Sequence, residues 1–505
     1  MKGSSEFSEI HDCYSTMNPA LLYAIIVVAT FVTPVILKLG CTGWYLLNLW
    51  PGQLLLKHLV YPFAFGRWRP WTSTRLSLLL QAAYFGLNFA FNVIGVYDVG
   101  HANQRSAILA AVNWLPLTFT GQPSFIASIT GLSLQTIIRA HGTVGVVLLV
   151  QAAALLCMAL SCLFITLRRR LYEIIMKFHY GLSLVALGAL WKHLEPRTTF
   201  PFLYIAVATC MLSSITAARV LYVLFRNVAR GEPLSRATVE PLDGAVKLSV
   251  TIPTPFRVRA GQYVHLWIPG IDFWSFFQAH PYTIAWWCDD YTGQATRAEF
   301  LVRCQRGFSD RFTRNFIGAN AFLSCIDGPY GVCHDLGDYG SVLLFATEIG
   351  IAAQIPYVKE LVRGFRDFKV RTRRIRLHWQ IDQESNQNWV DSWFNEILDG
   401  DPQKDLIQIR IYQTKGGDLS EHPTEKFGSH NRVWKIHQKM NIEEIFSKEL
   451  NAVRANMAVS VCSNMAVRNR VRELVRENVQ IPVRLFESEF QPDKVISPWL
   501  SKPRA

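Results

Sequence analysis

The chain has 505 residues, half of them hydrophobic and 12% aromatic, and its formal net charge is +13. This composition fits a membrane protein with a sizeable soluble part. It argues against nucleic-acid binding, because the lysines and arginines scatter or flank apolar stretches and form no basic stripe with exposed aromatic residues. The positive-inside rule for membrane proteins accounts for them more simply.

The cysteines and the N-terminal residues indicate the cellular environment of the protein. None of the ten cysteines has the spacing of a zinc site, so we expect mostly reduced thiols in a cytosol-facing protein. The first residues lack the basic start and the small-residue cleavage site of a signal peptide, and the first apolar span is therefore expected to be retained.

The first half contains several apolar stretches that can cross a bilayer, which takes ~20 residues in a helix. Those long enough are residues 20–38, 75–97, 142–167, 172–193 and 201–225, and the stretch 106–119 is marginal. After Arg226 the character changes: residues 231–233 read Gly-Glu-Pro, which is typical of a linker, and no later stretch is apolar and long enough to span.

Two histidines mark the stretch 172–193, which follows three arginines at 168–170. His179 and His193 are 14 positions apart. This step is close to four helical turns, so both imidazoles face the same way, about 21 Å apart along the axis. Histidine inside lipid is costly and usually serves a function. From the spacing alone two interpretations stay open: ligands of two stacked redox centres, or two satisfied histidines near opposite membrane interfaces.

The second half alternates strands and helices. Residues 246–252 and 263–268 predict strands of a small antiparallel barrel. The apolar strand 341–346 runs into a helix, and another such strand, 375–380, follows, which predicts a parallel α/β domain.

A flavin site is predicted in the barrel. The run 259–264 ends one strand and begins the next, and His280, Pro281, Tyr282 and Thr283 follow. The aromatic ring beside the proline can stack on an isoalloxazine, and the Thr283 hydroxyl can hydrogen-bond the flavin edge. Taken alone, this four-residue string also fits an ordinary strand and turn.

Further residues strengthen the flavin hypothesis. Arg303, Gly307 and Ser309 would supply a guanidinium, a backbone amide and a hydroxyl to a diphosphate. The motif also precedes an Asp-Gly-Pro-Tyr-Gly segment that contains Gly328 and Pro329. This order favours a flavin site.

A nicotinamide nucleotide site is predicted after the strand 341–346. The chain passes through Thr347, Gly350, Ile351 and Ala352 into a helix, the usual layout for a diphosphate at a helix N-terminus. A late apolar strand ends in Cys462 and Ser463, in register with this loop. An ordinary strand-to-helix turn is the other interpretation of the glycine loop alone.

Together these motifs resemble the fungal ferric reductase family, relatives of the superoxide-forming NADPH oxidases. The similarity covers nearly the whole chain from about Arg75. The His-Pro-aromatic-Thr motif at 280–283 matches the FAD motif of that family. The basic run 168–170, Tyr172, Glu173 and the two histidines match its second haem helix.

The resemblance implies the architecture and the cofactors. It implies a multi-pass α-helical membrane domain followed by a ferredoxin-reductase-like module, with an antiparallel β-barrel for FAD and a parallel-sheet α/β domain for NADPH. The corresponding regions are an N-terminal span and loop (1–70), a haem domain (71–228), an FAD domain (229–335) and an NADPH domain (336–505). Cys462 would lie at the hydride-transfer position near the nicotinamide.

The resemblance also implies the function. Electrons would pass from cytosolic NADPH through FAD and haem b to chelated Fe(III) or Cu(II) outside the cell, for iron or copper uptake. The protein would be multi-pass, in the plasma membrane with a cytosolic C-terminal half, and a homo-oligomer is compatible with the sequence. The alternatives are a superoxide-forming NADPH oxidase and a redox-impaired paralogue or truncated product.

The first haem helix of the family is incomplete in this chain. His141 matches its first histidine, but the partner position is Leu155, which cannot ligate iron, and one helix of the family has no counterpart before residue 168. The resemblance therefore implies an internal deletion and at most one haem with two histidine ligands. His141 pairs with His179 if the family geometry survives, or is level with His193 if 142–167 is one antiparallel helix.

Two further departures concern the nucleotide and the flavin. Glu348 puts an anion where a small residue is usual, so we expect Glu348→Gly to tighten NADPH binding. The family's terminal aromatic residue is replaced by Asp493, and Trp499 is a possible substitute. The choice of NADPH over NADH rests on the resemblance: a basic run could meet a 2′-phosphate or form a solvated face. The run consists of Arg371, Arg373, Arg374 and Arg376.

Overall fold

The computed structural model describes residues 22–27, 54–62, 64, 74–151, 172–193, 199–228, 234–269, 279–303, 321–401, 405–414, 424–427, 432–452 and 456–488. The chain divides into two compact units. The first comprises Met1–Asn48 and Leu76–Val220, and the second comprises Leu49–Arg75 and Leu221–Ala505. We call them the helical unit and the flavin–nucleotide unit.

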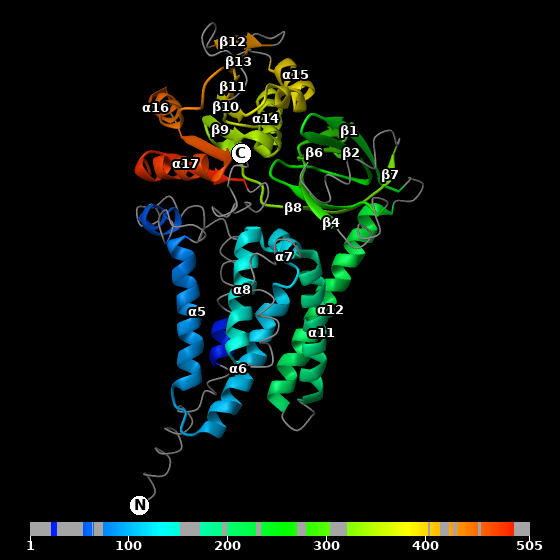
Figure 1. The fold of residues 1–505 in the computed structure, drawn as a ribbon, viewed down its shortest axis with the longest axis vertical. Helices are drawn as coiled ribbons and strands as arrows, with labels where there is room; N and C mark the ends of the chain where they lie inside the picture. The colour runs from blue at the N-terminus through cyan, green and yellow to red at the C-terminus, as the bar shows by residue number, and fades with distance from the viewer. Residues whose placement is uncertain are drawn as a thin grey trace, which may run out of the picture. The chain divides into compact units, whose positions relative to one another are not determined.

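Within the described residues, six helices lie wholly or mostly in the helical unit (Figure 1), in addition to the helical residues 22–27. They are α5 (Arg75–Val93), α6 (Val99–Phe119), α7 (Pro123–Thr130), α8 (Leu134–Gln151), α11 (Tyr172–His193) and α12 (Thr199–Asn227). The expected helices 75–97, 172–193 and 201–225 are confirmed as α5, α11 and α12. The marginal stretch 106–119 lies within the longer α6, and 20–38 and 142–167 fall largely outside the described residues.

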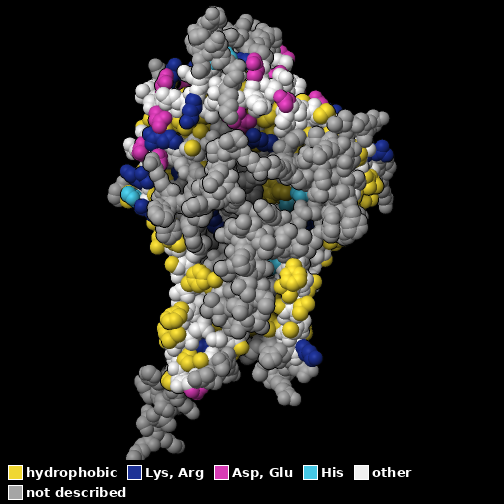
Figure 2. Space-filling model, in the orientation of Figure 1, with side chains coloured by type: hydrophobic (Ala, Val, Ile, Leu, Met, Phe, Trp, Pro, Cys, Tyr) yellow, Lys and Arg dark blue, Asp and Glu magenta, His cyan; other side chains and the backbone are white. Residues whose placement is uncertain are grey.

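Two helices pass a test of length and apolar composition for membrane spans within the described chain, Arg75–Val93 and Phe202–Asn227. Their outward faces are apolar: Leu80 is 61% exposed, Phe89 70% and Leu221 66%. Figure 2 shows such apolar side chains along the helices. Side chains of this kind are costly in water and favourable in lipid.

The interior of the helical unit combines apolar packing with paired polar groups. Trp114, Val144 and Leu187 belong to a buried cluster to which α6, α8, α11 and α12 contribute. Nearby on α5 and α6, the Asn113 side-chain amide donates to the Asn88 side-chain oxygen at 2.9 Å, and both residues are buried. Hydrogen bonds of this kind between helices hold bundles together in lipid.

The barrel of the flavin–nucleotide unit consists of two antiparallel sheets. The larger has the order β5-β6-β2-β1-β7 and the smaller β4-β3-β8. The strands are β1 (Arg236–Leu242), β2 (Ala245–Phe256), β3 (Tyr263–Trp267), β4 (Ala279–Thr283), β5 (Trp286–Asp289), β6 (Ala295–Arg303), β7 (Phe322–Leu323) and β8 (Cys325–Tyr330). Both sheets contribute to one buried core, which includes Leu248, Val264, Leu266 and Phe300. The predicted antiparallel barrel is confirmed.

The remainder of the unit is an α/β domain with a seven-stranded sheet in the order β12-β13-β11-β10-β9-β14-β15. The strands are β9 (Ser341–Thr347), β10 (Arg374–Ile381), β11 (Ile407–Gln413), β12 (Thr424–Phe427), β13 (Val433–Ile436), β14 (Met457–Cys462) and β15 (Val483–Glu487). The helices are α14 (Ile351–Arg366), α15 (Asp391–Asp399), α16 (Ile442–Ala452) and α17 (Met465–Glu477). β12 pairs antiparallel at one edge, and the other pairings are parallel. The predicted parallel α/β domain is confirmed.

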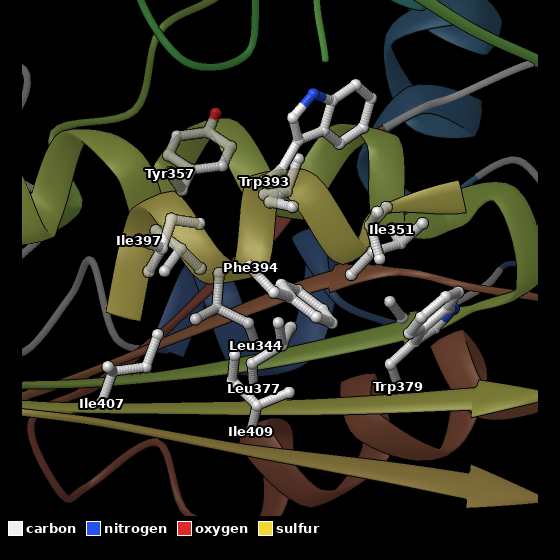
Figure 3. Close-up of a cluster of buried hydrophobic side chains, with 14 of the residues drawn as sticks. Leu344, Ile351, Tyr357, Leu377, Trp379, Trp393, Phe394, Ile397, Ile407 and Ile409 are labelled. Carbon is white, nitrogen blue, oxygen red and sulfur yellow. The ribbon is translucent and has the colours of Figure 1, made fainter. Parts of the chain in front are cut away.

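The apolar sequence of the central strand β9 is explained by its burial. All seven residues of β9 are buried, as expected of a parallel strand covered on both faces. In Figure 3, Leu344, Leu377 and Ile409 of the sheet face Phe394 and Ile397 of α15. The same core continues into the barrel, where the Trp286 ring stacks on Trp393 of α15 with centroids 5.8 Å apart.

Candidate functional site

The nucleotide loop lies where the strand order of the α/β sheet reverses. From β9 the chain continues to β10 on one side, whereas the later strand β14 pairs on the other side. Ligands of open α/β sheets bind at such a point, outside the carboxyl ends of the strands. Here β9 ends at Thr347 and β14 at Cys462. Thr347, Gly350, Ile351, Ala352, Cys462 and Ser463 are thus brought to the same edge.

The loops after β9 and β14 touch each other. A Cβ atom at Gly350 would lie 2.1 Å from the Cys462 carbonyl oxygen and 3.5 Å from its Sγ, so only glycine permits this approach. The Asn464 amide donates to the Thr347 hydroxyl at 2.8 Å. Gly350 precedes α14. The Ile351 amide already donates to the Glu348 carbonyl, so an anion would have to meet the amides that follow it in the first turn. This geometry fits a dinucleotide diphosphate.

Glu348 does not point its charge at the glycine loop. Its φ is +50°, and its carboxylate accepts hydrogen bonds from the Asp382 backbone amide and, at 2.8 Å, from the Asn386 side-chain amide. Its carbonyl accepts from the Trp379 indole at 2.8 Å. The sequence predicted that the Glu348 carboxylate would repel the diphosphate. In the structure this carboxylate is instead hydrogen-bonded to the loop after β10, so the reason for that prediction no longer holds.

The four arginines proposed for a 2′-phosphate lie at the opposite end of the sheet. Arg374 is opposite Ser341 in the register of β9 and β10, whereas Gln380 is opposite Thr347. Arg374 makes two hydrogen bonds to Glu449, at 2.8 and 3.1 Å, and Arg376 is buried beside the same carboxylate. Arg371 and Arg373 precede β10, and their backbone amides donate to Gly337 and Gly340. Of the two interpretations that the sequence left open for these arginines, their position disfavours a 2′-phosphate site, because ligands bind at the carboxyl ends of the strands.

The flavin motif lies on β4, paired with β3 in a fixed register. Tyr263 is opposite Thr283, and His265 is opposite Pro281. Because side chains alternate along a strand, Pro281 and Thr283 share one face of β4 while Tyr282 takes the other. Tyr282 is buried in the barrel core against Phe300, with ring centroids 6.5 Å apart. The ring expected to stack on an isoalloxazine is therefore packed inside the barrel.

The outer face of the three-stranded sheet carries a different set of aromatic rings, which we call the aromatic face: Tyr263, His265 and Tyr330. Their ring centroids lie 5.7 to 6.0 Å apart. On the next strand, β8, Gly328 has a φ of +142° and precedes Pro329 in the same segment. Sequence reasoning singled out the Asp-Gly-Pro-Tyr-Gly segment but did not predict this aromatic surface. The pairing of β3 with β4 and β8 creates it.

The helix α12 ends against β8. Asn227 is buried, and its side chain pairs with Ile326, donating to the carbonyl at 2.7 Å and accepting from the amide at 2.8 Å. The Tyr222 hydroxyl donates to the Gly328 carbonyl at 2.8 Å, and its ring lies 6.4 Å from that of Tyr330. The last residues of α12 thus support the strand that carries Gly328 and Pro329.

The other predicted flavin residues are partly described. Burial lowers the pKa of His280 to about 4, so its ring is neutral at pH 7. Arg303 is the exposed last residue of β6. Gly307, Ser309, Asp493 and Trp499 lie outside the described residues.

Two of the predicted haem ligands lie together in the helical unit. The rings of His141 on α8 and His179 on α11 have centroids 6.4 Å apart. The Thr120 hydroxyl donates to the Pro116 carbonyl at 2.7 Å and lies 3.1 Å from His141 Nδ1. If Nδ1 carries the ring proton, it can donate to this hydroxyl oxygen, and Nε2 then keeps its lone pair. Iron-binding histidines usually have such a partner.

The rest of the predicted haem set is not described. His193 ends α11, but its side chain lies outside the described residues, as do Leu155 and the arginines 168–170. Of the two pairings left open by the sequence, the proximity of His141 and His179 favours the one that preserves the family geometry.

Comparison with known proteins agrees with the two cofactor domains. Residues 233–334 match the family model of an FAD-binding domain, and residues 339–476 match that of the ferric reductase NAD-binding domain. These matches support a relationship of the second half of the chain to the fungal ferric reductase family. The chain therefore carries an FAD-binding domain and a NAD-binding domain joined in one unit.

Individual relatives are more distant. The probable cell surface ferric reductase kap2 of Aspergillus oryzae is 31% identical over 239 residues, which cover 44% of this chain and 30% of that one. The ferric/cupric reductase transmembrane component 2 of Saccharomyces cerevisiae is 22% identical, covering 54% and 42%. The respiratory burst oxidase homolog protein F of Arabidopsis thaliana is 23% identical, covering 43% and 27%. The matched regions thus span less than half of these relatives.

Among solved structures, the cytochrome P450 reductase GcoB of Amycolatopsis is similar to the chain, with a TM-score of 0.38 and 16% identity. The similarity covers 52% of this chain and 71% of that one.

Proposed function

We propose that the chain is a multi-pass membrane reductase that passes electrons from a reduced nicotinamide dinucleotide, through FAD and one haem b, to chelated Fe(III) or Cu(II). This extends the matched FAD- and NAD-binding domains to a complete electron path. The observation that carries the proposal is the pair His141 and His179, two imidazoles facing each other inside a helical unit whose chain continues into FAD- and NAD-binding domains.

The cofactors supply the redox chemistry: FAD, when bound, exchanges a hydride for single electrons, and haem carries these across the membrane. The chain's own residues bind and orient. Thr120 would orient the His141 ring through its contact with Nδ1. The turn at Gly350 lets amides of the first turn of α14 meet a diphosphate, and Cys462 lines the same edge, where a nicotinamide would lie. On the barrel, Thr283 offers a hydroxyl to a flavin, whereas the planes of the three rings of the aromatic face are inclined by 53° to 76° and Tyr330 is buried.

The names of the relatives support the proposed electron acceptor and the proposed location in the cell. Two matched proteins are named cell surface or transmembrane reductases of ferric or ferric and cupric ions. The plasma membrane, with the flavin–nucleotide unit in the cytosol, is the location that follows. The match to a respiratory burst oxidase makes dioxygen reduction the second candidate.

A reduced-minus-oxidised absorption spectrum of membranes that contain the full chain tests the proposal. We expect a b-type haem signal with about one haem per chain, since one histidine pair is assembled. His179→Ala should abolish it, and His58→Ala should not, because His58 is exposed on a short helix (Leu56–Val60) of the other unit.

Different outcomes separate the alternatives. Flavin bleaching by the nucleotide without haem reduction would favour the redox-impaired paralogue. Superoxide formation without reduction of a ferric chelate would favour the oxidase. A wild-type chain without a haem signal would refute the transmembrane path.

A further inference from the structure

A short turn lies beside the flavin motif. Residues 259–262, which we call the flavin turn, lead directly into β3, where Tyr263 is opposite Thr283. Within the turn, the Gln262 amide donates to the Arg259 carbonyl at 3.2 Å, and the Gln262 side-chain oxygen accepts from the Arg259 amide at 2.8 Å. The Gln262 carbonyl also accepts, at 3.0 Å, from the amide of Ile284, the residue after Thr283. The flavin turn therefore sets how β3 meets the motif on β4.

The flavin turn packs closely against two other elements of the unit. Gly261 has a φ of +88°, and a Cβ atom there would lie 2.5 Å from the Tyr357 hydroxyl of α14 and 2.8 Å from the Val332 carbonyl oxygen. A Cβ atom at Gly331, directly after β8, would lie 2.6 Å from the Gly261 carbonyl oxygen. A small displacement of α14 or of the end of β8 would therefore move the turn.

Glu360 ties this turn to α14. It lies about one helical turn after Tyr357, and its carboxylate accepts a hydrogen bond from the Ala260 amide at 2.9 Å. Ala260 is buried, so its amide needs a partner, and a carboxylate is a stronger acceptor than a neutral oxygen. Burial raises the pKa of Glu360, whereas the Ala260 amide and the Arg259 guanidinium act in the opposite direction. The NAD-binding domain thus supplies an ionisable group that holds the backbone of the flavin turn.

Two other side chains of α14 make polar contacts with a different strand of the barrel. The Lys359 ammonium donates to the Trp287 carbonyl at 2.8 Å, and Arg363 pairs with Asp289. Both partners belong to β5 of the larger sheet, whereas the flavin motif is on β4 of the smaller sheet. Among these three contacts, that of Glu360 is the one that reaches the flavin turn.

We propose that Glu360 is a positioning residue for the flavin: its carboxylate holds the flavin turn through the Ala260 amide and thereby sets β3 against the flavin motif. The inference rests on the proposed function, in which FAD lies at the barrel strands β3 and β4. It assigns to the NAD-binding domain a part in shaping the flavin site of its neighbour. The packing of α14 against the barrel therefore completes that site.

The full-length protein, purified in detergent and depleted of FAD, provides the test. FAD titration followed by flavin fluorescence gives the affinity, the visible circular dichroism of bound FAD reports its geometry, and calorimetric titration with NADP⁺ reports on the nucleotide site. Glu360→Ala should weaken FAD binding about tenfold, the effect of losing a hydrogen bond to a charged group, and change the dichroism spectrum. NADP⁺ affinity should stay within about twofold, because the start of α14 is roughly 14 Å from Glu360 along the helix axis.

Three further variants make the test specific. Glu360→Gln keeps an acceptor oxygen and should retain FAD affinity within about threefold, with the wild-type dichroism spectrum. Glu360→Met keeps the length of the side chain without that oxygen. It should behave like Glu360→Ala, and it keeps the inference testable if the alanine variant does not fold. Arg363→Ala is the matched control, since it removes a contact of the same helix to β5 and should leave FAD affinity and the spectrum unchanged.

Three outcomes would overturn the inference. Unchanged FAD affinity and dichroism in Glu360→Ala would show that the flavin turn does not depend on this contact. A Glu360→Gln variant as weak as Glu360→Ala would show that the charge matters and not the hydrogen bond. An equal loss of FAD and NADP⁺ affinity would show that Glu360 only stabilises α14. In each case the proposed function stands if NADPH reduces the flavin of the wild type, whereas a wild type that binds no FAD would refute the proposed function itself.

Discussion

The helical unit and the flavin–nucleotide unit place their apolar side chains in opposite ways. On α5 and α12, large residues of the helical unit such as Leu80, Phe89 and Leu203 are more than half exposed. In the α/β sheet every residue of β9 and β14 is buried. The first pattern suits a lipid surround, and the second suits a domain that folds in water around its own core.

The two units also differ in what their polar side chains do. In the helical unit a few side chains, such as Asn88 and Asn113, pair between helices. In the flavin–nucleotide unit the polar contacts organise loops around the predicted binding edges, as Glu348 does for Asp382 and Asn386. The contrast predicts that substitutions in the second unit change ligand binding and stability together, through close packing and hydrogen bonds.

The largest expected effect comes from the closest packing contact. Gly350→Ala places a methyl group 2.1 Å from the Cys462 carbonyl oxygen, and the loops must separate. We expect about 100-fold weaker nucleotide binding and a stability loss of ~3 kcal/mol. Nucleotide titration and thermal unfolding of the full chain measure both.

Gly400→Ala is the control for that substitution. Its nearest neighbours would be at 3.4 Å, so a loss below about 1 kcal/mol is expected. Normal nucleotide affinity in Gly350→Ala would contradict the close approach of the two loops.

Helix α12 contributes residues to both units, so a substitution near its end tests whether the two units differ in this way. Asn227→Leu keeps the size of the side chain but leaves the Ile326 amide and carbonyl unpaired in a buried place. The flavin–nucleotide unit should lose ~2–3 kcal/mol. The unfolding temperature, followed by flavin fluorescence, should fall by about 5–10 °C.

Asn388→Leu, at an exposed position before α15, is the matched control and should have little effect. An unchanged unfolding temperature in Asn227→Leu would show that the end of α12 is not integral to the barrel.

A smaller effect is expected from acid. Burial lowers the pKa of His280 to about 4 and that of His378 to about 3. Between pH 6.5 and these values the unfolded chain binds protons that the folded chain does not, so stability decreases as the pH falls through this window. His280→Gln should remove part of this slope, about 1–2 kcal/mol at pH 4, and His378 should account for a further part.

Unfolding of the full chain at a series of pH values measures the slope. The exposed His58 gives the control, because His58→Gln should leave the slope unchanged. An identical slope in His280→Gln and the wild type would show that His280 is not shielded from water.

The strands of the second unit could be predicted because their sequences carry a strong signal. A continuous apolar run, such as Ser341–Thr347, can satisfy its side chains only between two covering layers. The pairing of the ends of β9 and β14, where Cys462 is opposite Ala346, could also be anticipated, since both are buried parallel strands. Helix α11 was predicted with its observed bounds from its length and hydropathy.

Other features depend on partners far apart in the chain. Glu348 finds its partners at Asp382 and Asn386, 34 and 38 residues away, so its direction was not accessible from the local sequence. The choice between His179 and His193 as neighbour of His141 depends on how α8 and α11 cross.

Two points could have been decided from the sequence. Strand alternation already assigns Tyr282 and Thr283 to opposite faces, and Arg371 to Arg376 precede or begin β10, whereas ligands bind beyond its end.

The stacking of Trp286 on Trp393 has a consequence for how the cofactor domains respond to their ligands. The barrel and the α/β domain share one continuous core, and the Trp393 indole donates to Glu299 of the barrel at 2.8 Å. Two domains joined in this way melt in a single cooperative transition. By mass action, FAD bound to one domain then protects the other against heat and proteases, and loss of flavin exposes both.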